Sequence, residues 1–177
     1  LDMAKIESGH AEWHNSDIDL RALLSQAVQT TEPMLRERGA CIELQMPDSE
    51  LALPTLRADA DRLMQVLLNL LSNAAKFVPQ GSGRIQMRLT ADAAGVTISV
   101  QDNGPGVLAE QRALIFDKFH QGGDGTHRPQ GTGLGLPISR QIVEHFGGRM
   151  GLRDDTEQGA CFFFTLPWQA QQDGDKP

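Results

Sequence analysis

The sequence has no tyrosine, only two cysteines and no long hydrophobic run. Cys41 and Cys161 are too few and too far apart for a disulfide framework or a metal-binding knuckle. Both lie in apolar, strand-like runs, so we expect two small buried side chains. No apolar stretch approaches the roughly 20 residues that a membrane-spanning helix needs, and no stretch has the pattern of a signal peptide.

Positive charge is also scarce, because the 16 lysines and arginines are outnumbered by 23 acidic residues, which gives a net charge of −7. This balance disfavours non-specific binding to nucleic acid or to anionic membranes. A polyanionic ligand would have to be held locally, by backbone donors, a metal ion or a few placed cations. The 177 residues suit one compact domain. The missing initiator methionine and the polar end suggest a piece of a longer protein, with residues 169–177 as a disordered tail.

Hydrophobic spacing predicts alternating helices and strands. After a helical stretch over residues 1–14, we expect helices from Ser16 or Asp17 to Gly39 (disturbed near its end by Pro33), over 59–77, over 109–116 and over 133–146. Strands are expected over 40–46, 55–58, 84–90, 96–101, 150–153 and 160–166. The hairpin of 84–90 with 96–101 excludes a purely parallel sheet. The predicted class is therefore a two-layer α/β sandwich with a mixed sheet and about three packed helices.

The helix over 59–77 is apolar round most of its circumference but carries one polar stripe, formed by Gln65, Asn69, Ser72, Asn73 and Lys76. A solvated stripe is normally rich in Glu and Lys, whereas Asn costs about 0.5 kcal/mol more per interior helical position. An amide oxygen can ligate Mg²⁺, its NH₂ group can meet phosphate, and a lysine adds a point charge. The stripe therefore favours a ligand surface, with a water-facing amphipathic helix as the alternative.

A turn follows the strand over 96–101 and contains Asp102, Gly104 and Gly106. Asp-Asn-Gly is ordinary turn chemistry, and this alternative stays open. Two glycines and a proline within five residues also let the backbone approach a flat ligand closely. An ionised aspartate at the strand end can accept a hydrogen bond from an exocyclic amine such as that of adenine.

A glycine-rich segment opens the helix over 133–146. Such a segment presents free N–H groups and a positive dipole end to phosphate. Its G-x-G-x-G spacing does not match the dinucleotide fingerprint, and the sequence contains neither a P-loop nor the signature segments of a protein kinase. A purely structural hinge remains the alternative. The residues concerned are Gly131, Thr132, Gly133, Leu134, Gly135 and Leu136.

The loop over 117–130 is polar, rich in glycine and long enough to be functional. We expect Phe116 and Phe119 to anchor its start and its glycines to let it move as a lid over a ligand. A disordered surface loop is the alternative. Lys118, His127 and Arg128 are the cations that a phosphate would attract.

Together, the runs over 69–77, 102–106, 115–119 and 131–136 resemble the N, G1, F and G2 boxes of the catalytic, ATP-binding domain of sensor histidine kinases. The resemblance spans about residues 16–167, and residues 1–9 resemble the end of that family's dimerisation helix. It implies the Bergerat ATP-binding fold over 15–168, preceded over 1–14 by the end of a dimerisation and phosphoacceptor helix.

The resemblance also implies roles for the residues of these boxes. Asn73 would ligate Mg²⁺, Asn69 and Lys76 would reach the phosphates, Phe77 would border the base, and Asp102 would hold the adenine amine. The segment 131–136 would cover the phosphates from the lid. The remaining ATP contacts implied are Gly104, Gly106, Phe116, Arg128 and, as a further catalytic cation, Lys118.

Three departures from the family pattern limit what the resemblance implies. Gyrase-type ATPases have a water-activating glutamate where this chain has Asn69, so slow hydrolysis and phosphoryl transfer are expected. Many members have an arginine where this chain has Gln121, which leaves the γ-phosphate to Lys118 or Arg128. The last glycine box keeps Gly159 but is otherwise reduced, which puts polar contacts there in doubt.

None of the five histidines stands in the family's acceptor setting. The resemblance therefore implies a protein-histidine kinase domain that binds ATP and Mg²⁺ and phosphorylates a histidine on an upstream dimerisation domain. The same analogy implies a response-regulator receiver domain as a partner, a homodimeric parent protein, a cytoplasmic location for this domain and no nucleic-acid partner. Whether the parent is anchored in the inner membrane stays open. Two other functions stay open: a true ATPase of the same fold, and a nucleotide sensor or docking module without chemistry.

Overall fold

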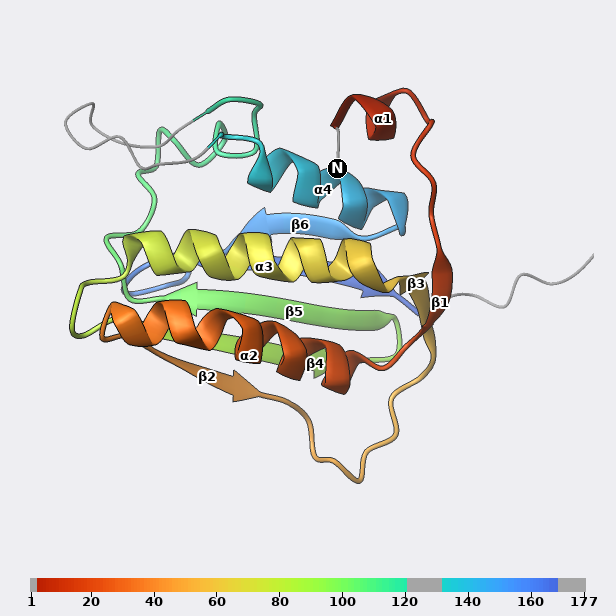
Figure 1. Cartoon of the computed structure of the whole chain (residues 1–177), viewed down its shortest axis with the longest axis horizontal. Coiled ribbons are helices and arrows are strands. Elements are labelled where there is room, and N and C mark those ends of the chain that lie inside the picture. Colours follow the sequence, from red (N-terminus) through yellow and green to blue (C-terminus); the bar gives the residue numbers. More distant parts are fainter. Residues whose placement is uncertain (1–2, 121–131, 169–177) are drawn as a thin grey trace, which may run out of the picture.

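The computed structural model describes residues 3–120 and 132–168, which form a sheet covered on one face by helices (Figure 1). The five-stranded sheet has the order β2-β4-β5-β7-β6. Only β2 and β4 run parallel, and the other neighbours are antiparallel. The strands are β2 (Cys41–Gln45), β4 (Arg84–Ala91), β5 (Gly95–Asp102), β6 (Arg149–Leu152) and β7 (Cys161–Pro167). The predicted mixed sheet is confirmed.

Three long helices pack side by side on that sheet: α2 (Leu20–Glu37), α3 (Ala60–Phe77) and α4 (Gly135–His145). The strands alternate between buried apolar and exposed polar residues, and the apolar positions join the helices in one core. α3 lies between α2 and α4 (Figure 1). The predicted two-layer sandwich is confirmed, and the central helix is the one that carries the polar stripe.

The start of α3 is fixed by Asp59, which is only 3% exposed. Its Oδ1 accepts hydrogen bonds from the backbone N–H groups of Asp61 (3.1 Å) and Arg62 (3.2 Å), as an N-cap does. Its Oδ2 accepts from the backbone N–H of His14 (2.8 Å). This one carboxylate therefore begins the helix and fastens the N-terminal segment to it.

The N-terminal segment departs from the sequence prediction in two ways. The first helix, α1, covers only Met3–Glu7 instead of residues 1–14. Residues expected to begin a helix form instead the strand β1 (Asn15–Ile18), which pairs antiparallel with β3 (Leu56–Asp59). The N-cap of α2 is Asp19, whose Oδ1 accepts from Ala22 N at 3.0 Å, and neither Ser16 nor Asp17 caps it. Pairing with β3, 40 residues away along the chain, overrides the local helical spacing.

Pro33 was expected to disturb the end of α2, but the helix continues to Glu37. Pro33 has no N–H to donate to the backbone carbonyl four residues earlier. Because Pro33 is exposed, water can donate a hydrogen bond to that carbonyl instead. Gly39, with φ of 64°, ends the helix as predicted.

Two smaller predictions also need correction. Residues 109–116 form a succession of turns, in which Leu114 and Ile115 both donate to the carbonyl of Gln111, and not an α-helix. Cys161 is buried as expected, but Cys41 is exposed because it lies at an outward position of the edge strand β2. Within the described residues, no helix is long and apolar enough to cross a membrane.

Candidate functional site

The polar stripe of α3 is half-buried except at its last residue. Gln65, Asn69, Ser72 and Asn73 all have intermediate exposure, and only Lys76, in the last turn, is exposed. The opposite side of the helix is buried in the core. Four of the five side chains of the stripe are therefore partly withdrawn from solvent.

Asn69 joins α3 to the first turn of α4. Its Nδ2 donates to the carbonyl of Gly135 at 3.2 Å and to Oγ of Ser139 at 3.0 Å. A Cβ placed on Gly135 would lie 3.7 Å from Cγ of Asn69, so the backbone of α4 approaches this side chain closely. The stripe and the glycine-rich helix start, 66 residues apart along the chain, thus lie against each other.

Asp102 lies at the end of β5 with its side chain facing the core, and it is 4% exposed. Its Oδ1 accepts from the backbone N–H groups of Gly104 (2.8 Å) and Ala160 (3.2 Å). Burial raises the pKa of this carboxyl, and these two hydrogen bonds oppose the rise. Among the described residues no donor meets Oδ2, which leaves that oxygen available as an acceptor.

Glycines bring the turn after Asp102 against two other segments. A Cβ on Gly104 would lie 2.6 Å from the carbonyl oxygen of Phe77, at the end of α3. A Cβ on Gly159 would lie 1.8 Å from the carbonyl oxygen of Asp102, and one on Gly106 would lie 2.9 Å from that of Gly159. Only glycine permits these approaches, and they place the Asp102 turn beside the last turn of the polar stripe.

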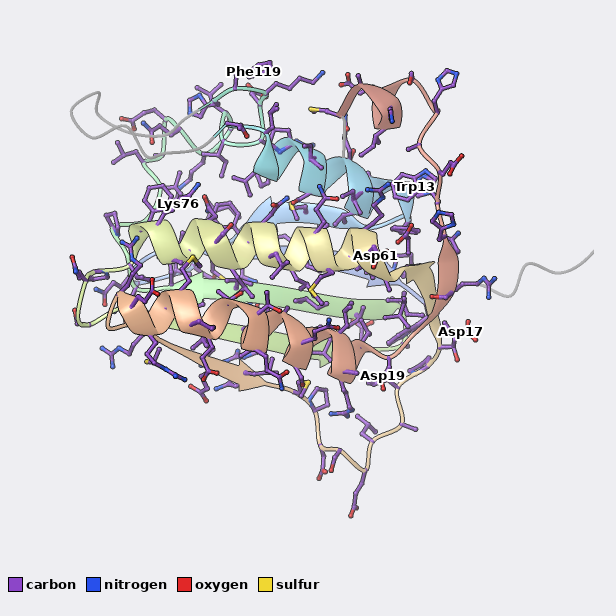
Figure 2. The ribbon with its side chains drawn as sticks, in the orientation of Figure 1. Trp13, Asp17, Asp19, Asp61, Lys76 and Phe119 are labelled. Atoms are coloured by element: carbon purple, nitrogen blue, oxygen red, sulfur yellow. The ribbon has the colours of Figure 1, made fainter. Side chains whose placement is uncertain are left out.

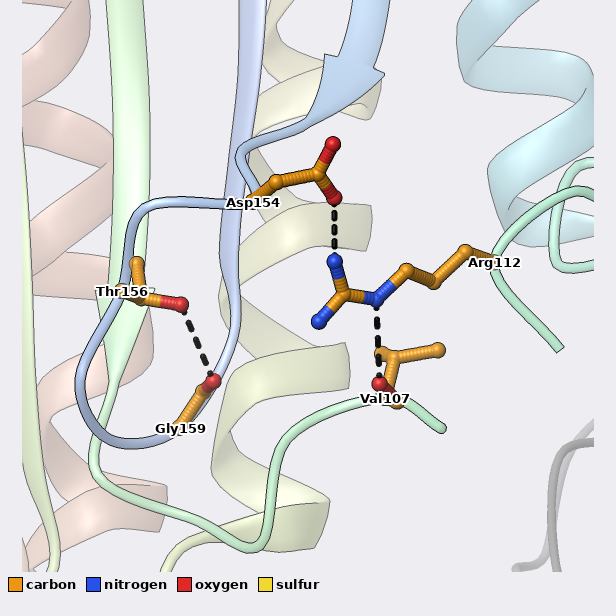
Figure 3. Close-up of polar contacts among 5 residues, drawn as sticks. All are labelled: Val107, Arg112, Asp154, Thr156 and Gly159. Atoms are coloured by element: carbon orange, nitrogen blue, oxygen red, sulfur yellow. Dashed lines mark hydrogen bonds and ion pairs between the residues drawn. The ribbon is translucent and has the colours of Figure 1, made fainter. Parts of the chain in front are cut away.

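Further contacts fasten the segment after this turn to the loop between β6 and β7 (Figure 3). The guanidinium of Arg112 pairs with Asp154, and its Nε donates to the carbonyl of Val107 at 3.3 Å. In the same loop, Oγ1 of Thr156 donates to the carbonyl of Gly159 at 3.4 Å. The backbone that surrounds Asp102 is therefore held from both sides.

The segment 116–120 meets the glycine-rich segment at the far end of the site. The Phe116 ring packs edge-on against Phe162, at 6.2 Å between centroids, as an anchor should. Phe119 does not anchor anything: its side chain is 71% exposed, and its backbone has φ of 61°. Its N–H donates to the carbonyl of Gly133 at 3.1 Å, and a Cβ on Gly133 would lie 2.8 Å from Cα of Phe119. The backbone contact, and not the ring, joins the two segments.

Lys118 was expected to face phosphate, and the structure pairs its ammonium with Glu7 of α1 instead. The same carboxylate accepts from Nε2 of Gln141 at 3.3 Å. Lys76 and Phe119 lie on the same side of the molecule (Figure 2), and Trp13 lies near the other end of α4. The stripe's exposed cation is therefore on the side where the lid segment begins.

The start of α4 has no side-chain cap among the described residues, because Leu134 holds the N-cap position. Oγ1 of Thr132 accepts from Leu134 N at 3.3 Å, which shapes the approach to the helix. A helix start with no side-chain cap keeps its donors for a ligand. Gln121, His127, Arg128 and Gly131 lie outside the described residues.

Three contacts in or near the site were not predicted from the sequence. The N–H of Ala160 bonds Asp102, and since the contact is through backbone, the side chain at this position gives no signal. Ser139 lies in the predicted helix over 133–146 but was not a predicted site residue, yet it is fully buried and bonded to Asn69. Trp13 stacks on His145 at 3.7 Å and meets Phe146 edge-on, which docks the N-terminal segment on α4. These contacts depend on the tertiary fold and leave no local signal in the sequence.

A separate hollow of about 470 Å³ lies between the start of α2 and the chain before β3, lined by residues 17–21, 49 and 51–55. None of its lining residues belongs to the predicted site. Among the described residues, no group of three or more His, Cys, Asp or Glu side chains is placed to hold a metal ion.

Comparison with known proteins gives a consistent picture. A family model described as histidine kinase-, DNA gyrase B- and HSP90-like ATPase matches residues 58–170. The chain is 38% identical over 174 residues to the sensor histidine kinase AruS of Pseudomonas aeruginosa, covering 94% of this chain and 17% of AruS. It is 34% identical over 171 residues to the adaptive-response sensory kinase SasA of Synechococcus, covering 94% of this chain and 44% of SasA. The chain thus spans less than half the length of these relatives.

Solved structures agree with the fold. Full-length ShkA, crystallised in complex with AMPPNP, superposes with a TM-score of 0.79 at 34% identity, covering 94% of this chain and 34% of that one. The catalytic domain of the histidine kinase ThkA, in a nucleotide-free form, superposes with a TM-score of 0.76 at 26% identity. That match covers 89% of this chain and 99% of the ThkA chain.

Proposed function

This chain belongs to the family of histidine kinase-, DNA gyrase B- and HSP90-like ATPases, and we propose that it is the catalytic domain of a longer sensor kinase. It binds Mg-ATP and delivers the γ-phosphoryl group to a histidine on an upstream dimerisation domain. The observation that carries the proposal is the meeting of three segments distant in sequence. Asn69 bonds the start of α4, and Gly104 lies against the end of α3, so Asp102, the polar stripe and the glycine-rich segment border one site.

The base end of the site suits adenine. The free Oδ2 of Asp102 can accept a hydrogen bond from the exocyclic amine, while Oδ1 is held by two backbone donors. Gly104 and Gly106 let this turn pack against Phe77 and Gly159, which holds the backbone beside the carboxylate in place. Phe77, at the end of α3, is 38% exposed, and its backbone carbonyl lies against the same turn. ATP itself is supported by the complex of the related ShkA with AMPPNP.

The phosphate end suits Mg²⁺ and a triphosphate. The amide oxygen of Asn73 is a hard oxygen ligand, and Mg²⁺ typically takes one or two protein oxygens together with substrate phosphates and water. When bound, Mg²⁺ would neutralise charge on the phosphate oxygens. Lys76 adds a cation, Lys118 a second one once released from Glu7, and the uncapped start of α4 adds N–H donors. By the same proposal Thr132, Gly133 and Leu136 line the phosphates.

Transfer is favoured over hydrolysis because no base faces the site from α3. Asn69 stands where a gyrase-type ATPase has its glutamate, and its amide cannot take a proton from water. In the first turn of α3 the acidic residue is Asp61, at the opposite end of the helix from Lys76 (Figure 2). A better nucleophile, the acceptor histidine, must therefore be brought to the nucleotide.

The domain division follows from this proposal. Residues 1–14 belong to the end of the dimerisation and phosphoacceptor region, with α1 (Met3–Glu7) as its helical part among the described residues, and 15–168 are the ATP-binding domain. The parent is a homodimer whose phosphohistidine passes its phosphoryl group to a response-regulator receiver domain. The site faces the cytoplasm in this arrangement.

Calorimetric titration of ATP, with and without Mg²⁺, tests the binding step. Wild type should bind ATP, Mg²⁺ should tighten binding, and Asn73→Ala should remove most of that tightening. Labelled ATP should leave the chain unlabelled unless the upstream domain is supplied, and then label that domain. Steady phosphate release by this chain alone, lost in Asn73→Ala, would instead identify an ATPase.

A further inference from the structure

The amide of Asn69 is held in one orientation by α4. The carbonyl oxygen of Gly135 can only accept a hydrogen bond, so the atom of Asn69 that meets it at 3.2 Å must be the NH₂ nitrogen. The second hydrogen of the same NH₂ group is taken by Oγ of Ser139 at 3.0 Å. Both amide hydrogens are therefore used within the protein.

The other atom of this amide is free. In the described part of the chain, no donor meets Oδ1 of Asn69. Because the amide is planar, the oxygen lies on the side away from the two acceptors of α4. An oxygen without a hydrogen cannot donate to a phosphate oxygen, but it can ligate a cation or accept from a water bound to one.

Ser139 is the residue that makes this arrangement complete. It lies one turn into α4 and has no exposed surface. A buried hydroxyl is costly unless it is hydrogen-bonded, and Asn69 supplies the bond from 70 residues away. With Gly135 alone, one amide hydrogen would lack a partner, and the side chain would lose one of its two restraints.

We propose that Ser139 is a positioning residue: together with the Gly135 carbonyl it fixes the Asn69 amide so that Oδ1 serves the magnesium of Mg-ATP. The inference rests on the proposed function. It assigns Asn69 an acceptor role toward the cation, in place of the phosphate-donor role that its NH₂ group would otherwise allow. It also links α3 to the first turn of α4, directly after the lid segment.

Calorimetry tests the proposal through the Mg²⁺-dependent gain in ATP affinity, measured as the ratio of the Kd without Mg²⁺ to the Kd with it. Ser139→Ala should reduce this ratio about three- to tenfold, the usual effect of losing one buried hydrogen bond. Affinity for ATP without Mg²⁺ should stay within about twofold of wild type, because the base end of the site is untouched. Asn69→Ala should reduce the ratio at least as much, and Ser139→Ala should add little to it.

Two matched variants separate positioning from packing. Ser139→Cys keeps nearly the same volume but replaces the strong acceptor by a weak one, so it should reduce the ratio as Ser139→Ala does. Ser25→Ala removes a hydroxyl of α2, outside the predicted site, that bonds only the backbone carbonyl of Arg21 at 2.8 Å, and it should leave the ratio unchanged. Thermal melting of each variant reports any loss of fold.

The proposal is overturned if Ser139→Ala and Ser139→Cys keep the wild-type ratio, or if they weaken binding equally with and without Mg²⁺. Failure of the underlying function looks different, because wild type itself would then bind no ATP or gain nothing from Mg²⁺. A Ser139→Ala protein that does not fold leaves Ser139→Cys to decide.

Discussion

The two ends of the site differ in how far the protein alone completes them. At the base end, Oδ1 of Asp102 is bonded twice to backbone, and Gly159 lies against the Asp102 carbonyl. At the phosphate end, Lys76 is exposed, Asn73 makes no side-chain hydrogen bond within the described residues, and α4 has no side-chain cap. Under the proposed function, the protein alone builds the base end of the site, whereas the phosphate groups and their cation would supply the missing partners of the other end.

The largest break in this comparison is expected from Gly159→Ala. A Cβ there would lie 1.8 Å from the Asp102 carbonyl oxygen, and φ is 74°, so the backbone of both segments must move. We expect the free energy of unfolding to fall by about 3 kcal/mol or more, from strain and overpacking together, and ATP binding to be lost. Chemical denaturation and calorimetry measure the two effects.

Gly81→Ala is the matched control for that substitution. Gly81 has a similar φ of 81°, but a Cβ there meets nothing within 4 Å. It should cost only the left-handed strain of about 1–2 kcal/mol and leave ATP affinity unchanged. If the two variants lost stability and ATP affinity equally, the close packing of Gly159 against Asp102 would not be what determines ATP binding.

Asp102→Asn should separate binding from folding at the base end. The new amide oxygen can still accept from Gly104 and Ala160, so stability should change little. Its NH₂ group, however, is a hydrogen-bond donor and would oppose the adenine amine, which is also a donor. The charge-assisted hydrogen bond from adenine to the carboxylate would therefore be lost. Such bonds contribute about 1.5–3 kcal/mol, so the Kd for ATP should rise roughly 10- to 100-fold by calorimetry. An unchanged Kd would show that Oδ2 does not read the base.

The same carboxyl predicts a pH dependence. Burial raises the pKa of Asp102, so its protonated form is populated at a higher pH than that of an ordinary aspartate. As pH falls through this raised pKa the acceptor is lost, and ATP affinity should fall in wild type relative to Asp102→Asn. The ratio of the two Kd values across an acid pH series measures this effect and cancels titration of ATP itself.

Stability should respond with the opposite sign. Between the ordinary and the raised pKa the folded state binds more protons than the unfolded one, so the stability contribution of Asp102 falls as pH rises through that window. Asp102→Asn should lack this component in denaturation curves. A contribution that increases with pH there would contradict a raised pKa.

The sequence predicts the base end better than the rest, for physical reasons. A strand that alternates up to Asp102 and a turn with two glycines are local signals, and the stripe of α3 follows from helical spacing alone. The pairing of β1 with β3, the hydrogen bond from Asn69 to Ser139 and the pairing of Glu7 with Lys118 join residues 38 or more positions apart. Nothing in the local sequence around Glu7 or Asn15 differs from an ordinary polar helix end. Such contacts follow only from the assembled fold.

The smallest effect is expected at the phosphate end, from Glu7→Gln. The carboxylate of Glu7 pairs with Lys118 and accepts from Gln141, and the hydrogen bond with Lys118 holds its pKa below the ordinary value. Both side chains are exposed, and exposed ion pairs are weak and screened by salt. Removing the charge frees Lys118 for the nucleotide, so ATP affinity should rise by only about twofold at low salt, and the gain should disappear at high salt. Glu12→Gln, which changes the net charge equally at an exposed residue of the same segment, is the control in the same titration. If both variants gain equally, net charge alone explains the rise; a gain confined to Glu7→Gln means that the N-terminal helix competes with ATP for this lysine.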